Sequence, residues 1–485
     1  MTAKESNSKY RYLAKNSILF TISSFGSKIL SFLLVPLYTY VLTTYELGLS
    51  GLVVTSSSLL VFAVTINIGD AVLRFAMDKA NDPHKIMAYG IRVIIRGTLI
   101  FSALSLIAYG INVIPWPRYC YLYLFLIVFV NSFLALFQNY LRSVDKVKDV
   151  AVSGVINTMF VIVSNLVFLL VLKIGIIGYF ASMVIGPFVA LIYCIIRTDD
   201  LKEVVFGAVC DKETQREMRR YSIPLIFNGI AWWVNSSLDK YFVTAICGVS
   251  QNGIYDVSSK IPGILSTFNG IFSQAWSLSA IKEFDKSDED GFFSKTYNSY
   301  NACLVLICSV LIVLNIPLAT LLFQKESFEA WNYSSLLLVA MVFNSMSGFT
   351  GSVFSAVKDS RSYAVTTITG AIVNTVLNFV LIINFQVIGA AIATIVSFAV
   401  TWFSRYILTR KYIMWKVNIC RDILAYSLLL LQVAFEHLSG HFYIGQLSCL
   451  LLLLVIYFSD LKMVLGKCMV TANKMLGNRL KGAGK

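Results

Sequence analysis

Charged side chains are scarce in this chain: Asp, Glu, Lys and Arg together make up 14% of its 485 residues. A soluble domain averages about 25% charged and about 45–50% apolar residues, whereas 57% of the residues here are hydrophobic. This composition argues against a soluble multidomain enzyme and against a disordered polycation. It is typical of a membrane protein.

Signatures of catalysis and metal binding are missing as well. The chain has only 3 His, and the closest pair of its 9 Cys (Cys303 and Cys308) fits no metal or redox spacing. A Gly-rich phosphate loop of the P-loop type does not occur, which argues against ATP hydrolysis within this chain. We therefore expect no catalytic residue, no metal site and no cofactor.

Long apolar runs are what the chain has in abundance. A transmembrane helix needs about 20 mostly apolar residues, and the runs predict an all-α polytopic membrane protein with about fourteen spans. Twelve spans is the alternative, because the ninth and thirteenth runs are the weakest. The predicted spans are residues 13–42, 48–75, 91–114, 119–141, 150–172, 177–197, 221–246, 252–281, 296–316, 331–356, 363–383, 387–409, 421–438 and 443–464.

The 40 basic residues are distributed unevenly between the two sides of these spans. With the N-terminus inside, all but seven of them fall in eight inner segments, including the group from Arg405 to Arg421. The positive-inside rule then places both termini in the cytoplasm. Basic residues spread over eight segments form no single binding face, which argues against a nucleic-acid partner.

An internal match indicates a repeated unit. The segment ELGLSGLVVT at residues 46–55 matches QNGIYDVSSK at residues 251–260, and each opens a predicted span with a glycine, Gly48 or Gly253. A repeat of six helices keeps both copies in the same orientation. We therefore expect two lobes related by an axis along the membrane normal, with a substrate cavity at their interface.

A second match, between residues 145–178 and 358–389, has a similar offset and supports the same repeat. The last two spans lie outside it. The predicted domains are an N-terminal lobe (1–197), a cytoplasmic linker (198–220), a C-terminal lobe (221–409) and two further spans with a basic cytoplasmic tail (410–485).

Seven ionisable residues lie within the first, second, seventh and eighth predicted spans, where a charge at depth costs at least about 2.5–3.5 kcal/mol and usually marks a pathway or a pocket. All seven belong to the first two spans of a predicted lobe, which are the natural walls of a central cavity. They are Lys28, Asp70, Arg74, Asp239, Lys240, Asp256 and Lys260.

Lys28 is the most central of these charges. It lies about fifteen residues from either end of its span, and the resulting ~22 Å, at 1.5 Å per residue, is beyond the reach of a lysine side chain. We expect Lys28 to line a water-filled cavity or to contact an anion. A buried structural ion pair is the alternative.

The charges of the seventh and eighth spans allow two interpretations. Asp256 and Lys260 are four residues apart, hence on one helix face, and Asp239 and Lys240 lie at a similar depth. They either form a structural cluster of ion pairs, or they gate the substrate and take up a coupling ion.

Charges near the ends of spans have simpler explanations. Arg74, four residues after Asp70, can extend to the cytoplasmic surface. Arg92 and Arg96 begin the third span, and we expect them to face lipid phosphates, with entry of an anionic substrate as the alternative. Glu436 is expected at the outer membrane interface.

Amides and aromatic rings accompany the charges on the seventh and eighth spans. Stacked aromatic rings beside amides would suit a sugar, but helix packing also explains such residues. Pro36, Pro224 and Pro262 can kink the first, seventh and eighth spans. The amides and aromatic residues are Asn228, Trp232, Trp233, Asn235, Asn269, Gln274 and Trp276.

Short motifs in both predicted lobes resemble those of a known transporter family. The segments LTTYELG at residues 42–48 and IGDAVLRF at residues 68–75 resemble the N-terminal hairpin of the polysaccharide-transport (Wzx-type oligosaccharide flippase) family. The segments LDK at residues 238–240 and GIY at residues 253–255 resemble it too. This family is part of the multidrug/oligosaccharidyl-lipid/polysaccharide exporter superfamily.

The resemblance implies two six-helix lobes around a central cavity, and translocation of undecaprenyl-pyrophosphate-linked oligosaccharides (O-antigen, capsule or related surface polysaccharide) across the bacterial cytoplasmic membrane. It also implies cationic cavity residues that meet the pyrophosphate or anionic sugars. The expected substrate contacts are Lys28, Arg74, Asp239, Lys240, Asp256 and Lys260. The candidate groups for proton or sodium coupling are Asp70, Asp239 and Asp256.

Three alternatives to this function are considered. An ion-coupled multidrug exporter of the same superfamily needs an acidic cavity, whereas the charges within the spans are four bases and three acids. A peptidoglycan-precursor lipid flippase agrees with fourteen spans. A membrane glycan polymerase or ligase would be expected to have a large external loop, and the predicted outer loops have at most about fifteen residues.

Overall fold

The computed structural model describes residues 32–78, 80–111, 115–199, 210–282, 284–438 and 442–462. Within these ranges every regular secondary-structure element is a helix, which confirms the predicted all-α class. Lys28 and most of the first predicted span lie outside the described residues.

Packing divides the chain into two compact units. The first unit ends at Asp256 and includes the short segment Leu322–Ser327, and the remainder forms the second. The first unit holds α2 (Val35–Val41), α3 (Thr44–Thr65), α4 (Ile68–Ala76), α5 (Pro83–Ile111), α6 (Arg118–Ser143), α7 (Val147–Asn165) with a π-helical end (Leu166–Val171), α8 (Gly175–Ile196), α9 (Lys212–Ser237), α10 (Asp239–Cys247) and most of α11 (Val249–Ser258). The second unit holds α12 (Pro262–Lys282), α13 (Phe292–Val313), most of α14 (Asn315–Leu322), α15 (Trp331–Ala356), α16 (Ser360–Thr409), α17 (Ile419–Glu436) and α18 (Phe442–Ile456).

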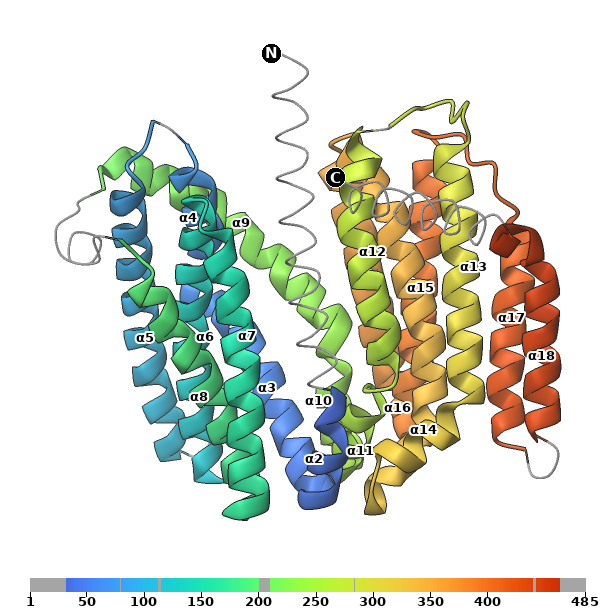
Figure 1. Cartoon of the computed structure of the whole chain (residues 1–485), viewed down its shortest axis with the longest axis horizontal. Helices are drawn as coiled ribbons and strands as arrows, with labels where there is room; N and C mark the ends of the chain where they lie inside the picture. The colour runs from blue at the N-terminus through green and yellow to red at the C-terminus, as the bar shows by residue number, and fades with distance from the viewer. Residues whose placement is uncertain are drawn as a thin grey trace, which may run out of the picture. The chain divides into compact units, whose positions relative to one another are not determined.

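Helix α6 lies at the centre of the first unit. It packs against α3, α4, α5, α7 and α8, and α5 to α8 run side by side along much of their length (Figure 1). Leu136 and Phe137 of α6 share a buried apolar core with Val72 of α4 and Met87 of α5. This core holds α4, and a smaller cluster of Val64 (α3) and Val128 (α6) holds α3.

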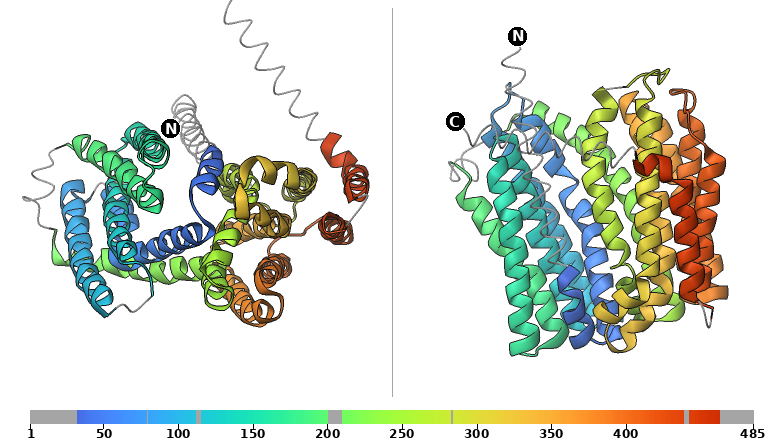
Figure 2. Two further views of the ribbon diagram at one scale, coloured as in Figure 1. Left: turned by 90° about the horizontal axis from the view of Figure 1, so that it is seen from below. Right: turned by 45° about the vertical axis from the view of Figure 1, so that its right-hand side comes forward.

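Helix α15 has the corresponding position in the second unit. It packs against α12, α13, α16 and α17, and α18 packs on α13 and α17. Figure 2 (left) shows several of these helices nearly end-on. Phe349 of α15 stacks on Trp276 of α12, with ring centroids 4.2 Å apart.

The outer surfaces of the long helices are apolar. On α5, for example, Leu99, Ile100 and Leu106 are 65%, 63% and 69% exposed, and a helix that is apolar on its exposed side as well belongs in a membrane. Within the described residues, eight helices are long and apolar enough to cross one. The protein is therefore a multi-pass membrane protein, and the number of fourteen spans stays a prediction.

Three predicted spans are each broken into two helices. Ile66 and Asn67 separate α3 from α4 and have left-handed backbone angles (φ 50° and 51°). Leu238 separates α9 from α10, and residues 259–261 separate α11 from α12. Pro262 follows this last break as the first residue of α12, a position at which its missing N–H costs no helical hydrogen bond.

The division by packing differs from the predicted lobe boundary at residues 198–220. Helix α9 begins inside the predicted linker, where the Asp211 carboxylate accepts a hydrogen bond from the Thr214 backbone N–H (2.8 Å) and caps the helix. It then packs against α3 and α4, which places α9 and α10 in the first unit. The six-helix lobes stay a prediction from the sequence repeat.

Candidate functional site

The two glycines matched in the repeat meet where α3 crosses α11. A Cβ added to Gly253 would lie 1.9 Å from the Thr44 carbonyl oxygen, and a Cβ added to Gly48 would lie 2.0 Å from the Val249 carbonyl oxygen. Thr44 precedes Gly48 by four residues, as Val249 precedes Gly253. The contact is therefore the same when viewed from either helix, as a local two-fold axis requires.

Asp239 opens α10 beside this crossing and is buried. Its carboxylate accepts a hydrogen bond from the Tyr255 hydroxyl of α11 (2.6 Å) and another from the Lys240 backbone N–H (2.9 Å). A carboxylate withdrawn from water needs such donors to remain ionised. The Tyr255 bond also ties α10 to α11.

Lys240 and Asp256 form a second link between the same two helices. The Lys240 ammonium lies 2.5 Å from an Asp256 carboxylate oxygen, and both side chains are largely shielded from solvent (19% and 14% exposed). Asp256 also packs against Gly51 of α3, where an added Cβ would lie 3.2 Å from the Asp256 carboxyl carbon. Gly51 and Asp256 are repeat equivalents, so this ion pair lies at the local axis.

Polar aromatic side chains connect this charged cluster to the rest of α3. The Trp233 indole N–H of α9 donates to the Thr55 carbonyl oxygen (3.0 Å), and the Tyr241 hydroxyl of α10 bonds to the Ser56 hydroxyl (2.5 Å). The Trp233 and Tyr241 rings are 5.5 Å apart. Trp233 therefore contributes to the packing of α9 against α3.

The structure brings together only some of the predicted site residues. Asp239, Lys240 and Asp256 share the cluster just described. Asp70 lies in the first turn of α4 and accepts a hydrogen bond from the Asn67 side chain (2.8 Å). Arg74 is exposed in the last turn of α4. Lys260 follows α11 and belongs to the second unit, and Lys28 lies outside the described residues.

The predicted sugar-binding aromatic residues have different environments. Trp276 is buried, and its indole N–H donates to the Phe349 carbonyl oxygen (3.2 Å). Asn269 accepts a hydrogen bond from the Tyr300 hydroxyl (2.7 Å). Both residues are therefore part of the packing of the second unit, whereas Trp232 of α9 is 64% exposed.

Arg405, which the sequence places in an inner segment, is buried near the end of α16. Its guanidinium donates to the hydroxyls of Thr366 and Thr367 at the start of α16 (3.2 and 2.8 Å) and to the Ser347 carbonyl oxygen of α15 (2.9 Å). It also lies 4.3 Å from the centre of the Tyr363 ring. Arg405 thus joins helices, a role that its sequence position does not predict.

Two acidic residues of α17 are also buried in the second unit. The Asp422 carboxylate accepts a hydrogen bond from the Tyr457 hydroxyl (3.1 Å). The Glu436 carboxylate accepts one from the Asn315 side chain (2.7 Å) at the C-terminal end of α17, and its position at the outer membrane interface stays a prediction. Gln432 lies between them on the same buried face and bonds to Ser309 (2.8 Å). Asp422, Gln432 and Glu436 are polar residues within an apolar predicted span, and this pattern could have predicted that they are buried against other helices.

Metal binding finds no support in the part of the chain that the structure describes. There, no group of three or more His, Cys, Asp or Glu side chains could hold a metal ion. The charged cluster holds one ammonium and two carboxylates, those of Lys240, Asp239 and Asp256. Ionisable residues inside membrane spans usually mark a pathway or a pocket.

Comparison with known proteins identifies the family. A family described as "Polysaccharide biosynthesis protein" matches residues 13–277, which is more than half of the chain. The chain belongs to this family. The matched region extends from the first predicted span to α12, so it contains the whole charged cluster of Asp239, Lys240 and Asp256.

One curated relative is a protein of Haloferax volcanii named "Probable low-salt glycan biosynthesis flippase Agl15". It is 25% identical to this chain over 187 residues. The match covers 36% of this chain and 39% of that protein, so the chain is matched to less than half of the relative's length.

Solved structures of transporters share the fold over most of the chain. The lipid II flippase MurJ in an inward closed conformation has a TM-score of 0.63 at 14% identity, covering 92% of this chain and 99% of that one. An inward-facing MATE family multidrug transporter of the MOP superfamily has a TM-score of 0.62 at 11% identity, covering 83% and 95%. A MOP superfamily transporter from Pyrococcus furiosus has a TM-score of 0.56 at 12% identity, covering 86% and 96%. At these identities the comparison shows a common fold.

Proposed function

We propose that the protein is a flippase that moves a lipid-linked oligosaccharide across a bacterial cytoplasmic membrane, and that it is a transporter rather than an enzyme. Membership of a polysaccharide biosynthesis family supports this proposal, as does similarity to a relative named as a glycan biosynthesis flippase. One structural observation carries it: a multi-pass membrane protein of this family keeps the Lys240–Asp256 pair and the buried Asp239 at a helix crossing inside its spans.

The chemistry of the substrate explains why such charges are needed. The hydroxyls and phosphates of a lipid-linked glycan would lose their hydrogen bonds in hydrocarbon, at a cost of several kcal/mol per group (about 2–7). A hydrophilic cavity shields them while the polyprenyl tail stays in the lipid. We assign the contacts with pyrophosphate or anionic sugars to Lys28, Arg74, Lys240 and Lys260. Undecaprenyl pyrophosphate is the proposed carrier.

Ion coupling would act through the carboxylates of the same helices. In our proposal, uptake of a proton or sodium ion by Asp256 neutralises the partner of Lys240. An unpaired ammonium in a low-dielectric site is costly, so Lys240 is then free to bind the anionic substrate. Asp239 and Asp70 are the other candidate coupling groups. Alternating access would expose the cavity to one side of the membrane at a time, with both termini in the cytoplasm.

An export assay tests this function. A bacterial strain that lacks its own flippase for a known surface glycan would produce this chain, and the lipid-linked glycan exposed on the outer leaflet would be measured. We expect Lys240→Ala to lower export by about tenfold or more, since losing one hydrogen bond to a charged group is worth about 1.5–3 kcal/mol. Lys28→Ala should have a similar effect.

Lys146→Ala is the matched control. Lys146 forms an ion pair of the same length with Asp199 (2.5 Å), but Asp199 is 76% exposed, and exposed pairs contribute little. The amount of each variant in the membrane must equal that of the wild type. Full export by both Lys240→Ala and Lys28→Ala would contradict the proposed anion contacts. Resistance to cationic drugs without glycan export would favour the multidrug exporter.

A further inference from the structure

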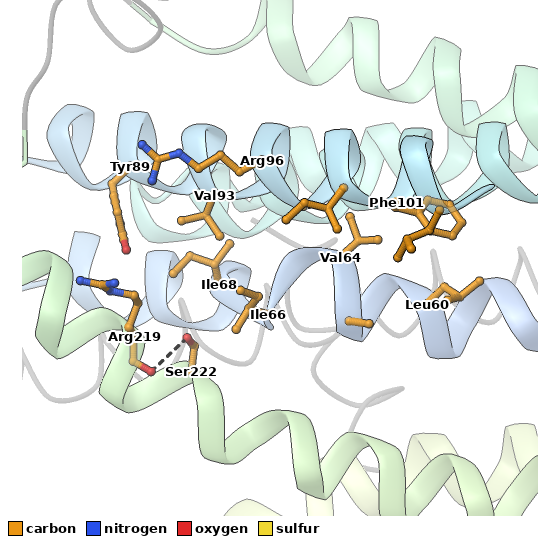
Figure 3. A pocket seen from close by; sticks show the side chains of 14 residues that line it. Leu60, Val64, Ile66, Ile68, Tyr89, Val93, Arg96, Phe101, Arg219 and Ser222 are labelled. Carbon is orange, nitrogen blue, oxygen red and sulfur yellow. Dashed lines mark hydrogen bonds between the residues drawn. The ribbon is translucent and has the colours of Figure 1, made fainter. Parts of the chain in front are cut away.

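A pocket away from the charged cluster opens in the first unit where α3 breaks into α4. It has a volume of about 350 Å³, within the ~300–1,000 Å³ typical of small-molecule sites. Figure 3 shows side chains of α3, α4, α5 and α9 converging on it. Its lining includes Leu60, Val64, Ile100, Phe101 and Leu104, all apolar.

Two arginines give this apolar pocket a cationic end. Arg96 of α5 and Arg219 of α9 lie at the same end of it as Tyr89, and the apolar side chains extend to the other end (Figure 3). Arg219 donates to the Gln215 carbonyl oxygen of its own helix (3.4 Å). Among the described residues, neither arginine forms an ion pair with a carboxylate. Two guanidiniums that pair with no carboxylate of the described residues, beside an apolar lining, match an anionic amphiphile.

The backbone beside the pocket is strained. Ile66 lines it with φ 50°, a left-handed conformation that is a genuine outlier for a β-branched residue. The Thr65 hydroxyl lies on the other side of the break, where it accepts a hydrogen bond from the Asn67 backbone N–H (3.2 Å). Strained backbone of this kind clusters at ligand sites.

We propose that this pocket binds an anionic phospholipid of the membrane, with its phosphate between Arg96 and Arg219 and an acyl chain along Val64, Ile100 and Leu104. Guanidinium groups bind phosphate through paired, charge-assisted hydrogen bonds. The acyl chain packs against the apolar lining. This site is separate from the Lys240–Asp256 pair, so the proposal goes beyond glycan transport and does not depend on it.

Binding by the purified full-length protein tests the proposal. Protein in detergent is titrated with phosphatidylglycerol, with phosphatidylcholine of the same acyl chains, and with inorganic phosphate. Native mass spectrometry counts bound lipid, and thermal melting reports stabilisation. We expect phosphatidylglycerol to bind and raise the Tm, and the other two ligands to do neither.

Matched variants locate the site. In the double variant Arg96→Gln/Arg219→Gln, the affinity for phosphatidylglycerol should fall by about tenfold or more. The control Arg216→Gln/Arg220→Gln removes two arginines of α9 that do not line the pocket and should keep wild-type affinity. Ala63→Leu fills the apolar part without changing charge and should also weaken binding.

Several results would overturn the proposal. One is equal binding of phosphatidylcholine, and another is equal stabilisation by inorganic phosphate, since the lining would then play no part. A third is the same loss of affinity in both double variants. Displacement of the phospholipid by polyprenyl phosphate at equimolar concentration would also overturn it, because the pocket would then belong to the transported lipid.

Discussion

At the scale of single residues, Asp359 shows how one carboxylate can hold several segments. It precedes α16 and accepts hydrogen bonds from the Ser362 backbone N–H (3.0 Å) and the Tyr412 hydroxyl (2.6 Å). The Lys411 ammonium is 3.3 Å away. The hydrogen bonds from Ser362 and Tyr412, with a further contribution from Lys411, hold the pKa of Asp359 well below its usual range.

This lowered pKa predicts a pH dependence of stability. The folded state binds the proton of Asp359 less tightly than the unfolded state, whose Asp pKa is about 3.9. The contribution of Asp359 is therefore fully present above about pH 4 and is lost as the pH falls through the folded pKa. Asp359→Asn should lower the Tm at neutral pH, and its difference from the wild type should shrink below about pH 4.

Melting curves of both proteins between pH 3 and pH 7 measure this difference. Asp290→Asn is the control, because it removes an exposed carboxyl whose oxygens accept no hydrogen bond from the described residues. A gap between wild type and Asp359→Asn that stays constant over this range would show that the charge of Asp359 does not contribute.

Whether a charged residue could be predicted from sequence depended on its distance from the span ends. Asp239 and Lys240 lie inside an apolar run, and Asp256 pairs at i,i+4 with Lys260 in the next one, so their unusual position was visible in the sequence. Arg405 lies about one turn from the end of α16, where a basic residue is ordinarily a cytoplasmic anchor. Its burial depends on the hydroxyls of Thr366 and Thr367, which come close only in the folded structure.

At the scale of elements, the crossing of α3 and α11 depends on the absence of side chains at two positions. In both contacts the obstacle is a backbone carbonyl, which cannot rotate away as a side chain can. Gly253→Ala should therefore push the helices apart and destabilise the first unit, by about 1–3 kcal/mol as for other overpacked sites. Gly48→Ala should behave in the same way.

Thermal melting of purified variants checks this expectation, with Gly263→Ala as the control. Gly263 lies in the first turn of α12, and an added Cβ there would meet nothing within 4 Å. Because alanine has a higher helix propensity than glycine, Gly263→Ala should be neutral or stabilising. If Gly253→Ala melted at the same temperature as Gly263→Ala, the close crossing would be disproved.

The helix breaks mark the limit of what hydropathy could predict. An apolar run gives the presence of a span, and most predicted spans correspond to helices with ends shifted by a few residues. The break at Ile66 and Asn67 contains no Gly or Pro, and Asn67, of a residue type that favours left-handed backbone angles, is its one weak sequence signal. The break before Pro262 carries a stronger signal, because Pro262 predicts a kink there. Gln386, inside α16, has non-helical backbone angles (φ 51°, ψ −135°) and lies between the predicted spans 363–383 and 387–409, so this break was predicted.

At the scale of the whole molecule, sequence symmetry and packing divide the chain differently. The repeat groups residues by ancestry and pairs Gly48 with Gly253, the two glycines that the structure brings together where α3 crosses α11. Packing groups residues by contact, and it keeps α9 and α10 with α3 and α4. The helices at this division are also those with the in-span charges. Helices α9 and α10 belong to the C-terminal lobe by the sequence repeat but pack in the first unit. Such an arrangement would suit the alternating access of the proposed flippase.

The membrane orientation gives the last prediction. With both termini inside, the loop before α13 lies in the cytoplasm and the segment before α15 lies outside, because basic residues concentrate on the cytoplasmic side. Glu289 and Glu329 are exposed residues of these two segments. We expect Glu329→Cys to react with a membrane-impermeant maleimide in intact cells, and Glu289→Cys to react only after permeabilisation. Replacing the exposed Cys420 by serine in the parent removes its background labelling. Labelling of Glu289→Cys in intact cells would show that the orientation is opposite to the predicted one. The proposed flippase would then move its substrate in the opposite direction.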